Sequence, residues 1–320
     1  MPLGQWLDIW LEDYTGGIKD GTRKGYADNC RLHIKPALGA IRLCELQPHD
    51  CQTFINRLGK PRKGKKPLSP KTIKNIHGTL CKALSEAARI KYIPSNPANG
   101  TILPKTMQEE ICPFEGEEIT DFLKAIQGNP SEALFYIAIN TGMRLSELLG
   151  LRWSRVDFKK STIKVDAQML VKRGTGTDRR LGSPKNDKVR TFKAPQSVMQ
   201  MLKAVQLEQK ENRLKSGGLW ENNLDLVFTN ELGTGIPHST VEHRYGKIVA
   251  GLGLDRRFHD LRHTFATESI RCGVDFKTLS EMLGHYSVAF TLDVYGHVTK
   301  AMQDDAAQRL ELAILERKTS

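Results

Sequence analysis

A proline-rich stretch divides this chain of 320 residues into two unequal parts. The stretch covers residues 94–113, has few apolar residues and contains four prolines: Pro94, Pro97, Pro104 and Pro113. This composition is typical of a linker. A single hydrophobic core seldom grows beyond ~250–300 residues, so the length also favours two domains. The sequence therefore predicts a domain over residues 1–95, a linker over 96–112 and a second domain over 113–320.

Most of the excess positive charge lies in the first of these parts. The whole chain has 48 Lys and Arg residues against 36 Asp and Glu, a net charge of +12. Residues 1–105 have 18 basic and 8 acidic residues, whereas residues 106–320 have 30 and 28. A basic domain joined to a nearly neutral one is typical of a protein that holds a polyanion such as nucleic acid.

The spacing of apolar residues predicts a mainly helical chain. In the first domain they recur every three or four positions, as at Trp6, Trp10 and Tyr14, which predicts about four short helices. The second domain alternates apolar and polar residues, as a strand does, at 162–166, 168–172 and 188–193. Helical patterns surround these strands at about 115–127, 131–141, 197–214, 238–250, 261–272, 275–283, 287–294 and 301–316. The expected fold class is therefore mainly α with a small antiparallel β-sheet in the second domain.

Several classes of protein are disfavoured. The longest apolar run, Ala133–Ile139, is too short to span a membrane, and no signal sequence opens the chain, so we expect a cytoplasmic protein without a membrane partner. The six cysteines form no CxxC pair, which argues against a zinc ribbon and a disulfide framework. The absence of GxxxxGK[ST] argues against a P-loop nucleotide site.

A basic loop is expected between two helices of the first domain. Residues 60–67, KPRKGKKP, combine five basic residues with glycine and proline, which break helices. Contacts to phosphates strengthen binding because they release counterions. A merely solvated loop is the alternative. The expected DNA contacts come from this loop and the helix after it: Lys60, Arg62, Lys63, Lys65, Lys66, Lys71 and Lys74.

The segment TGMRLSELLGL, residues 141–151, places an arginine at the start of a predicted helix. The free N–H groups and the dipole at a helix N-terminus favour an anion. Arg144 would add a guanidinium at that point and form a phosphate clamp. An ordinary surface arginine is the alternative interpretation.

The segment FHDLRHTF, residues 258–265, has two interpretations. His259 and Arg262 are three residues apart on a predicted helix and can approach one small anion together. His259 and His263 have the spacing of a two-histidine metal site, with His285 as a third ligand. Asp, Leu and Arg stand between the two histidines in place of the glutamate motif HExxH, which disfavours the metal site.

Two further blocks complete an ordered series, LGH at His285 and VYGH at Tyr295. TGMRLSELLGL, HDLRHTFAT, LGH and TLDVYGHV resemble the signature blocks of the tyrosine recombinase (phage integrase) family, in particular integrases of phages and conjugative transposons. LGQWLDIWLEDY and HIKPALG look like the core-binding domain of such integrases. The resemblance spans about residues 3–316.

The resemblance implies an enzyme that cuts and rejoins DNA. Tyr295 would attack a phosphodiester and form a 3′-phosphotyrosyl intermediate, so that neither a metal nor ATP is needed as a cofactor. The positive and hydrogen-bonding groups implied around the phosphate are Arg144, His259, Arg262 and His285. The family places the acceptor of the tyrosine proton near His259.

The resemblance also implies a general acid and supporting residues. Lys185 corresponds to the lysine that protonates the leaving 5′-oxygen, although Asn186 stands where threonine is common. Lys188 and Lys172 are therefore alternatives. Glu147 is expected to orient part of the catalytic site without touching the DNA itself. His263 is expected to be structural and not catalytic.

The implied assembly is a homotetramer on two double-stranded recombination sites. Each protomer would clamp DNA in a C shape between a helical, SAM-like core-binding domain and a mixed α/β catalytic domain. An excisionase or a DNA-bending protein is an expected accessory partner, and the bound protein would lie at the bacterial nucleoid. The chain starts near the core-binding domain, which indicates either a shortened protein or a relative without an arm-binding domain.

A helix at about 300–316 is expected to mediate subunit exchange. Its apolar stripe would pack on a neighbouring subunit or on its own domain: Met302, Ala306, Leu310, Ala313 and Ile314.

The site alone leaves two other functions open, since type IB topoisomerases use the same chemistry and a DNA-binding regulator needs no catalysis.

Overall fold

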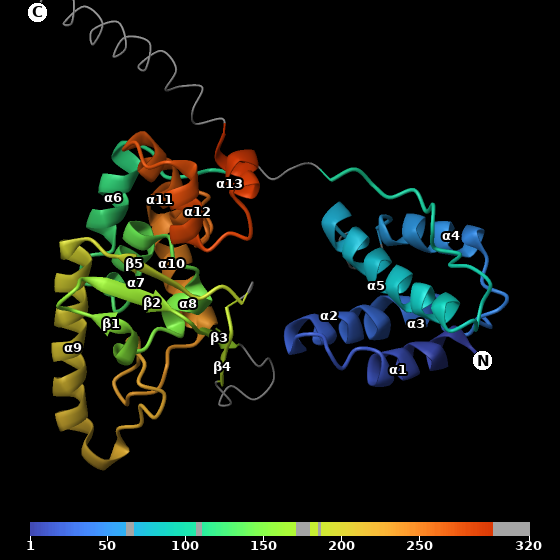
Figure 1. The fold of residues 1–320 in the computed structure, drawn as a ribbon, viewed down its shortest axis with the longest axis horizontal. Helices are drawn as coiled ribbons and strands as arrows, with labels where there is room; N and C mark the ends of the chain where they lie inside the picture. The colour runs from blue at the N-terminus through green and yellow to red at the C-terminus, as the bar shows by residue number, and fades with distance from the viewer. Residues whose placement is uncertain (62–66, 107–110, 171–179, 185–186, 297–320) are drawn as a thin grey trace, which may run out of the picture. The chain divides into compact units, whose positions relative to one another are not determined.

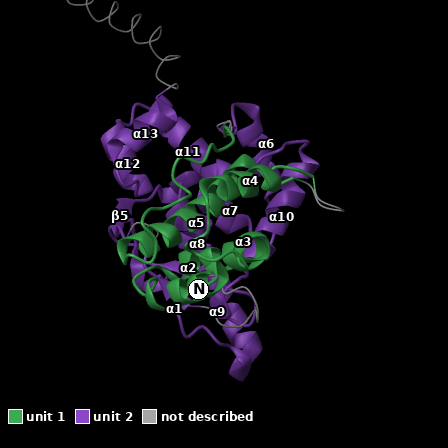
Figure 2. Cartoon of the chain, turned by 90° about the vertical axis from the view of Figure 1, so that its right-hand side faces the viewer, with its two compact units in different colours: residues 1–109 green, residues 110–320 purple. Residues whose placement is uncertain are grey.

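The computed structural model describes residues 1–61, 67–106, 111–170, 180–184 and 187–296. The chain forms two compact units, Met1–Glu109 and Glu110–Ser320 (Figure 2). Each unit is described by itself below.

The first unit is built of helices, as predicted (Figure 1). α5 begins where the Ser69 side chain accepts a hydrogen bond from the Thr72 backbone N–H, and Pro70 occupies the first helical position. A π-helical turn, Cys30–Ile34, joins the second and third helices. The helices are α1 (Leu3–Asp13), α2 (Asp20–Asn29), α3 (Lys35–Leu38), α4 (Pro48–Leu58) and α5 (Pro70–Arg89).

The core of this unit packs α1 against α5. Trp6 is fully buried, and its Nε1 donates to the backbone oxygen of Ala83 on α5 at 2.9 Å. Its partner in sequence, Trp10, is buried one turn later, and Leu80 and Leu84 face the same core. The three-to-four residue spacing of α1 thus produces one apolar face that the other helices cover.

The segment after α5 packs on the first unit. Asn96 Nδ2 donates to the Cys81 oxygen at 3.0 Å and to Ser85 Oγ at 2.8 Å, both on α5. Gln52 on α4 exchanges two hydrogen bonds with the backbone of Ile102. These residues, predicted as part of a linker, are therefore tied to α4 and α5 by side-chain contacts that the proline content does not indicate.

The second unit combines helices with short strands (Figure 1). Its first helices are α6 (Glu117–Ala125), α7 (Glu132–Thr141) and α8 (Leu145–Leu149). The strands are β1 (Val156–Asp157), β2 (Thr162–Val165), β3 (Gln168–Leu170), β4 (Arg180–Gly182) and β5 (Arg190–Lys193). The later helices are α9 (Gln196–Ser216), α10 (His238–Gly251), α11 (Asp260–Arg271), α12 (Phe276–Leu283) and α13 (Val288–Tyr295).

The strands form two small antiparallel sheets in the order β1-β2-β5 and β3-β4. In the first sheet Ile163 pairs with Phe192 and Val165 pairs with Arg190. These residues face the core, while the alternate ones on β5 are exposed. The prediction of a mainly helical fold with a small antiparallel sheet is confirmed, and the described residues form two such sheets in place of one.

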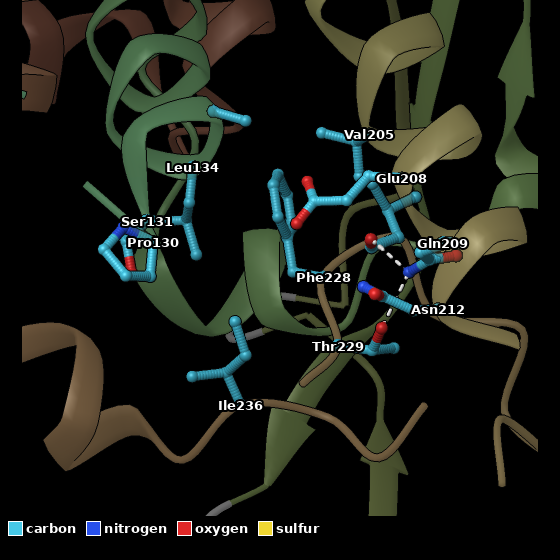
Figure 3. A pocket seen from close by; sticks show the side chains of 12 residues that line it. Pro130, Ser131, Leu134, Val205, Glu208, Gln209, Asn212, Phe228, Thr229 and Ile236 are labelled. Carbon is cyan, nitrogen blue, oxygen red and sulfur yellow. Dashed lines mark hydrogen bonds between the residues drawn. The ribbon is translucent and has the colours of Figure 1, made fainter. Parts of the chain in front are cut away.

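One glutamine ties the long helix α9 to the rest of the unit (Figure 3). Gln209 Nε2 donates to the Val227 oxygen at 2.7 Å and to Thr229 Oγ1 at 2.9 Å, and Gln209 Oε1 accepts from Trp153 Nε1 at 2.8 Å. The small pocket beside it is lined by the start of α7, by α9 and by the segment that ends at Ile236. That pocket contains none of the predicted catalytic residues.

A separate apolar cluster joins the last three helices of the described chain. It consists of Ala266, Ile270, Leu279, Leu283 and Tyr295, which come from α11, α12 and α13. These helices lie together at one end of the second unit (Figure 1). Within the described residues, no helix is both long enough and apolar enough to cross a membrane.

Candidate active site

A tight turn places Arg144 at the start of α8. Gly142 ends α7 at a φ of 60°, and a Cβ atom there would lie 2.5 Å from Cδ1 of Phe265 on α11. The turn therefore requires glycine for both its conformation and its close approach to α11. Arg144 is the N-cap of α8, as predicted, and its Nη1 donates to Glu147 Oε1 at 2.8 Å.

Glu147 is a fully buried carboxylate between two arginines. Besides Arg144, it accepts hydrogen bonds from Arg190 Nη1 at 3.1 Å and Arg190 Nη2 at 2.7 Å. Burial alone raises the pKa of a carboxyl group, but the hydrogen bonds and charge of Arg190, with the charge of Arg144, lower the pKa of Glu147 to about 2. Glu147 is therefore ionised and holds both guanidinium groups in place.

Arg262 is held by backbone carbonyls. Its Nη1 donates to the Gly142 oxygen at 2.7 Å and its Nη2 donates to the Leu283 oxygen at 2.6 Å. Burial first, and the nearby charge of Arg144 second, lower the pKa of Arg262 to about 9, so the side chain stays charged at neutral pH. One buried cation thus connects the ends of α7 and α12 to α11.

His285 follows directly after α12 and is buried. Its Nδ1 lies 2.8 Å from Thr291 Oγ1, a contact that fixes the plane of the ring. Burial and then the charges of Arg262, Arg144 and Arg190 lower the pKa of His285 to about 3. The ring is neutral in the free protein and lies within the field of the arginines.

The segment that leads into β5 holds the backbone next to His285. Lys188 Nζ donates to the backbone oxygens of His285 at 2.9 Å and Tyr286 at 3.3 Å. Arg190 Nε donates to the Met282 oxygen at 2.7 Å. Lys185, the predicted general acid, and Lys172 lie outside the described residues. Lys188, the other alternative to Lys185, donates to the backbone of His285 and Tyr286.

Arg190 was not among the residues singled out from the sequence. β5 alternates buried and exposed residues, with Arg190 and Phe192 on the buried side. An arginine at an inward position of an amphipathic strand is an unusual pattern, because a buried charge needs a partner. This pattern is a signal that Arg190 has a buried partner, and the structure shows that the partner is Glu147.

Tyr295 is the last residue of α13, and its side chain is only 1% exposed. Its Oη lies 2.8 Å from His263 Nδ1. Burial raises the pKa of Tyr295 to about 12, although the charges of Arg262 and Arg144 act in the opposite direction. The predicted nucleophile therefore lies in the electrostatic field of both arginines and contacts His263, which was expected to be only structural.

His259 precedes α11 as its N-cap and remains exposed. Its ring meets that of His263 edge to face, with the centroids 5.0 Å apart. Partial loss of water around the ring, and then the charges of His263, Arg262 and Arg144, lower the pKa of His259 to about 4. Within the described residues, these histidines belong to no group of three or more side chains arranged to hold a metal ion.

The predicted DNA contacts of the first unit are described only in part. Lys60 is exposed after α4, and Lys71 is exposed in the first turn of α5. Lys74 is half-buried, and its Nζ donates to Thr106 Oγ1 at 3.0 Å. Arg62, Lys63, Lys65 and Lys66 lie outside the described residues, as does the predicted helix at 300–316.

Comparison with known proteins identifies two family domains in the chain. Residues 111–302 match the phage integrase family, and residues 3–59 match the phage integrase N-terminal SAM-like domain. A tyrosine recombinase XerC-like protein of Caldanaerobacter subterraneus subsp. tengcongensis is 33% identical over 96% of this chain and 82% of its own length. The integrase of Staphylococcus phage L54a is 25% identical over 95% of this chain and 91% of its own.

Solved structures share the fold. The Tn1549 transposon integrase, determined in complex with transposon right end DNA, superposes with a TM-score of 0.80 and 25% identity over 98% of this chain and 100% of that chain. A lambda integrase dimer bound to a COC' core site superposes with a TM-score of 0.65 at 18% identity, over 92% of this chain and 77% of that one. The chain therefore belongs to the phage integrase family, the tyrosine recombinases, whose members break and rejoin DNA.

Proposed function

We propose that the chain is a site-specific recombinase that integrates or excises a mobile genetic element, with Tyr295 as its nucleophile. One observation carries the proposal: α8, α11, α12 and α13 bring a buried tyrosine hydroxyl into the field of Arg144 and Arg262. His285 lies in the field of the same two arginines. This arrangement suits a reaction in which negative charge develops on a phosphate beside a phenolic oxygen.

The chemistry follows from these groups. Tyr295 Oη gives up its proton to an acceptor near His259 and attacks the phosphorus. The bond from phosphorus to the 5′-oxygen breaks, and the DNA remains attached through a 3′-phosphotyrosyl ester. Arg144 and Arg262 neutralise the charge that develops on the non-bridging oxygens, and His259 and His285 donate hydrogen bonds to these oxygens. Lys185 gives the leaving 5′-oxygen its proton. The ester conserves the energy of the broken bond, so that resealing needs no ATP.

Different residues would provide general affinity for DNA and contact the reacting phosphate. The first unit holds most of the excess positive charge, and Lys60 and Lys71 are exposed there, which suits contacts to many phosphates. The Tn1549 integrase was solved with transposon DNA, which supports double-stranded DNA as the partner of this chain too. Phage and transposon integrases both occur among its relatives, so either kind of element fits.

The proposed working form is a homotetramer on two recombination sites. Lambda integrase was solved as a tetramer bound to a Holliday junction, and it shares the fold of this chain. The apolar stripe of residues 302–314 would link neighbouring subunits. An excisionase or a DNA-bending protein would set the direction of the reaction, and the complex would act in the cytoplasm at the nucleoid.

A trapped intermediate tests the proposed function. Wild type and Tyr295→Phe are incubated with candidate-site DNA that carries a nick next to the cleavage position, so that the cut fragment diffuses away and the intermediate accumulates. We expect a denaturant-resistant adduct with wild type and none with Tyr295→Phe, while both proteins bind the DNA equally. Binding without any adduct would favour a DNA-binding regulator, and removal of supercoils without sequence preference would favour a topoisomerase.

A further inference from the structure

The contact between His263 and Tyr295 is the feature of the site that the proposed chemistry does not use. His263 Nδ1 and Tyr295 Oη are 2.8 Å apart, although 32 residues separate them in the chain. The two rings are tilted at 54° with their centroids 5.7 Å apart. The tilt excludes stacking of the two rings, and the short distance between the two atoms is that of a hydrogen bond.

The ring and the hydroxyl of Tyr295 are held by different groups. The ring packs in the apolar cluster with Ala266, Ile270, Leu279 and Leu283. These side chains place the ring but cannot orient the O–H bond, because they have no hydrogen-bonding atoms. His263 supplies the polar contact at the tip of the ring, where a buried hydroxyl needs a partner.

His263 is itself fixed by its helix. The first turn of α11 is anchored by Asp260, whose Oδ2 accepts from the Arg257 backbone N–H at 2.6 Å. Thr264, the next residue after His263, accepts from the Phe114 backbone N–H at 2.8 Å through its Oγ1. Arg262, the residue before it, is tied to two carbonyls. The imidazole is therefore carried by a segment with contacts on both sides, which suits a residue that sets the position of another group.

We propose that His263 is a positioning residue for the nucleophile: its Nδ1 accepts a hydrogen bond from the Tyr295 hydroxyl and so directs a lone pair of Oη toward the phosphate held by Arg144 and Arg262. The proposal rests on the proposed role of Tyr295. It assigns to His263 the Nε2–H tautomer, because Nδ1 can accept a hydrogen bond only when it carries no proton itself.

The protonation states agree with positioning in preference to proton removal. Burial and then Arg262 and Arg257 lower the pKa of His263 to about 4, although Asp260 acts in the opposite direction. Tyr295, with a pKa of about 12, keeps its proton against so weak a base. The hydrogen bond therefore orients a neutral hydroxyl before the phosphate arrives.

Two substitutions separate positioning from proton acceptance. His263→Asn places an amide oxygen near the position of Nδ1 and still accepts a hydrogen bond, but it cannot take up a proton. His263→Leu keeps a side chain of moderate size and accepts nothing. The measurement is the single-turnover rate of adduct formation on the nicked DNA, with enzyme in excess, between pH 6 and pH 9.

We expect His263→Leu to be slower than wild type by about 10- to 100-fold, the cost of a misplaced reacting group. His263→Asn should stay within about threefold of wild type and show the same pH profile, because orientation is retained. A rate for His263→Leu equal to that of wild type would overturn the proposal. A rate for His263→Asn as low as that of His263→Leu would also overturn it and would make His263 a proton acceptor.

A second measurement tests the contact between His263 and Tyr295 without relying on adduct formation. DNA binding and thermal unfolding of both variants are compared in the wild-type and Tyr295→Phe backgrounds. The drop in midpoint caused by His263→Leu should shrink when the hydroxyl is already absent, because the two changes remove the same hydrogen bond. An equal drop in both backgrounds counts against the contact. If wild type forms no adduct, the proposed function fails, and this comparison still decides whether His263 holds the hydroxyl.

Discussion

Replacing Glu147 by glutamine removes one negative charge from a fully buried site and leaves the shape of the side chain almost unchanged. The carboxylate holds Arg144 and Arg190, and the Arg190 side chain is only 7% exposed. The glutamate pKa falls from an ordinary value of 4.5 to about 2 in the folded chain. At about 1.4 kcal/mol per pH unit, this difference corresponds to about 3 kcal/mol of stability at neutral pH.

The sign of the pH dependence follows from the lowered pKa. Below pH 4.5 the unfolded chain takes up a proton that the folded chain refuses, so the stabilisation is present above pH 4.5 and is lost as the pH falls toward 2. The free energy of unfolding of Glu147→Gln should therefore be lower than that of wild type by about 3 kcal/mol at pH 7 and by only about 1 kcal/mol at pH 3.

The measurement is denaturant unfolding followed by circular dichroism at several pH values. Glu268→Gln is the matched control in the same unit, because Glu268 pairs with Arg271 at 2.8 Å with both side chains about 40% exposed. Such a surface pair contributes only ~0.2–1 kcal/mol. A Glu147→Gln difference below about 1 kcal/mol at pH 7, or one that is the same at pH 7 and pH 3, would refute the reasoning.

Three further changes test other parts of the molecule. Gly142→Ala should lower stability by more than about 2 kcal/mol, whereas Gly128→Ala, also at positive φ but with open space around it, should cost about 1 kcal/mol; equal unfolding midpoints would contradict the close approach to Phe265. Neutralising Lys63, Lys65 and Lys66 should weaken DNA binding and flatten its salt dependence without slowing cleavage of bound DNA, and Arg144→Ala or Arg262→Ala should do the reverse; binding titrations at several salt concentrations and cleavage of saturated complexes check this. In the free protein the rings of His259 and His285 should titrate below pH 5 by NMR, and bound cleavage-site DNA should raise both midpoints; midpoints near 6.5 in the free protein would show that the site does not repel a proton.

The spacing of apolar residues predicted most helices of the second unit. The helix pattern at 275–283 became α12 (Phe276–Leu283), and that at 287–294 became α13 (Val288–Tyr295). Short alternating runs likewise became β2 and β5. The packing of residues 96–102 on α4 and α5 was not predictable, because it depends on hydrogen bonds of Asn96 and Gln52 that no spacing encodes.

The candidate site residues that lie within a short sequence motif could be predicted from the sequence. Arg144, Arg262, His285 and Tyr295 each lie in such a block, and the structure places them in one region of electrostatic contact. Arg190 and the role of His263 were not predictable in the same way. Each becomes meaningful only through a partner in a distant block, Glu147 for the first and Tyr295 for the second.

The way in which the arginines are held explains how a nearly neutral unit can present a positive site. Arg144 and Arg190 share one carboxylate, that of Glu147, so this group of three keeps one net positive charge. Arg262 is held by the carbonyls of Gly142 and Leu283, at the ends of α7 and α12, where the helix dipoles are negative. Carbonyls orient a guanidinium without cancelling its charge. A second carboxylate would order Arg262 equally well, but it would neutralise the positive charge that binds the phosphate. Because Arg262 is held by carbonyls, these three arginines and one glutamate keep a net charge of about +2 for the reacting phosphate.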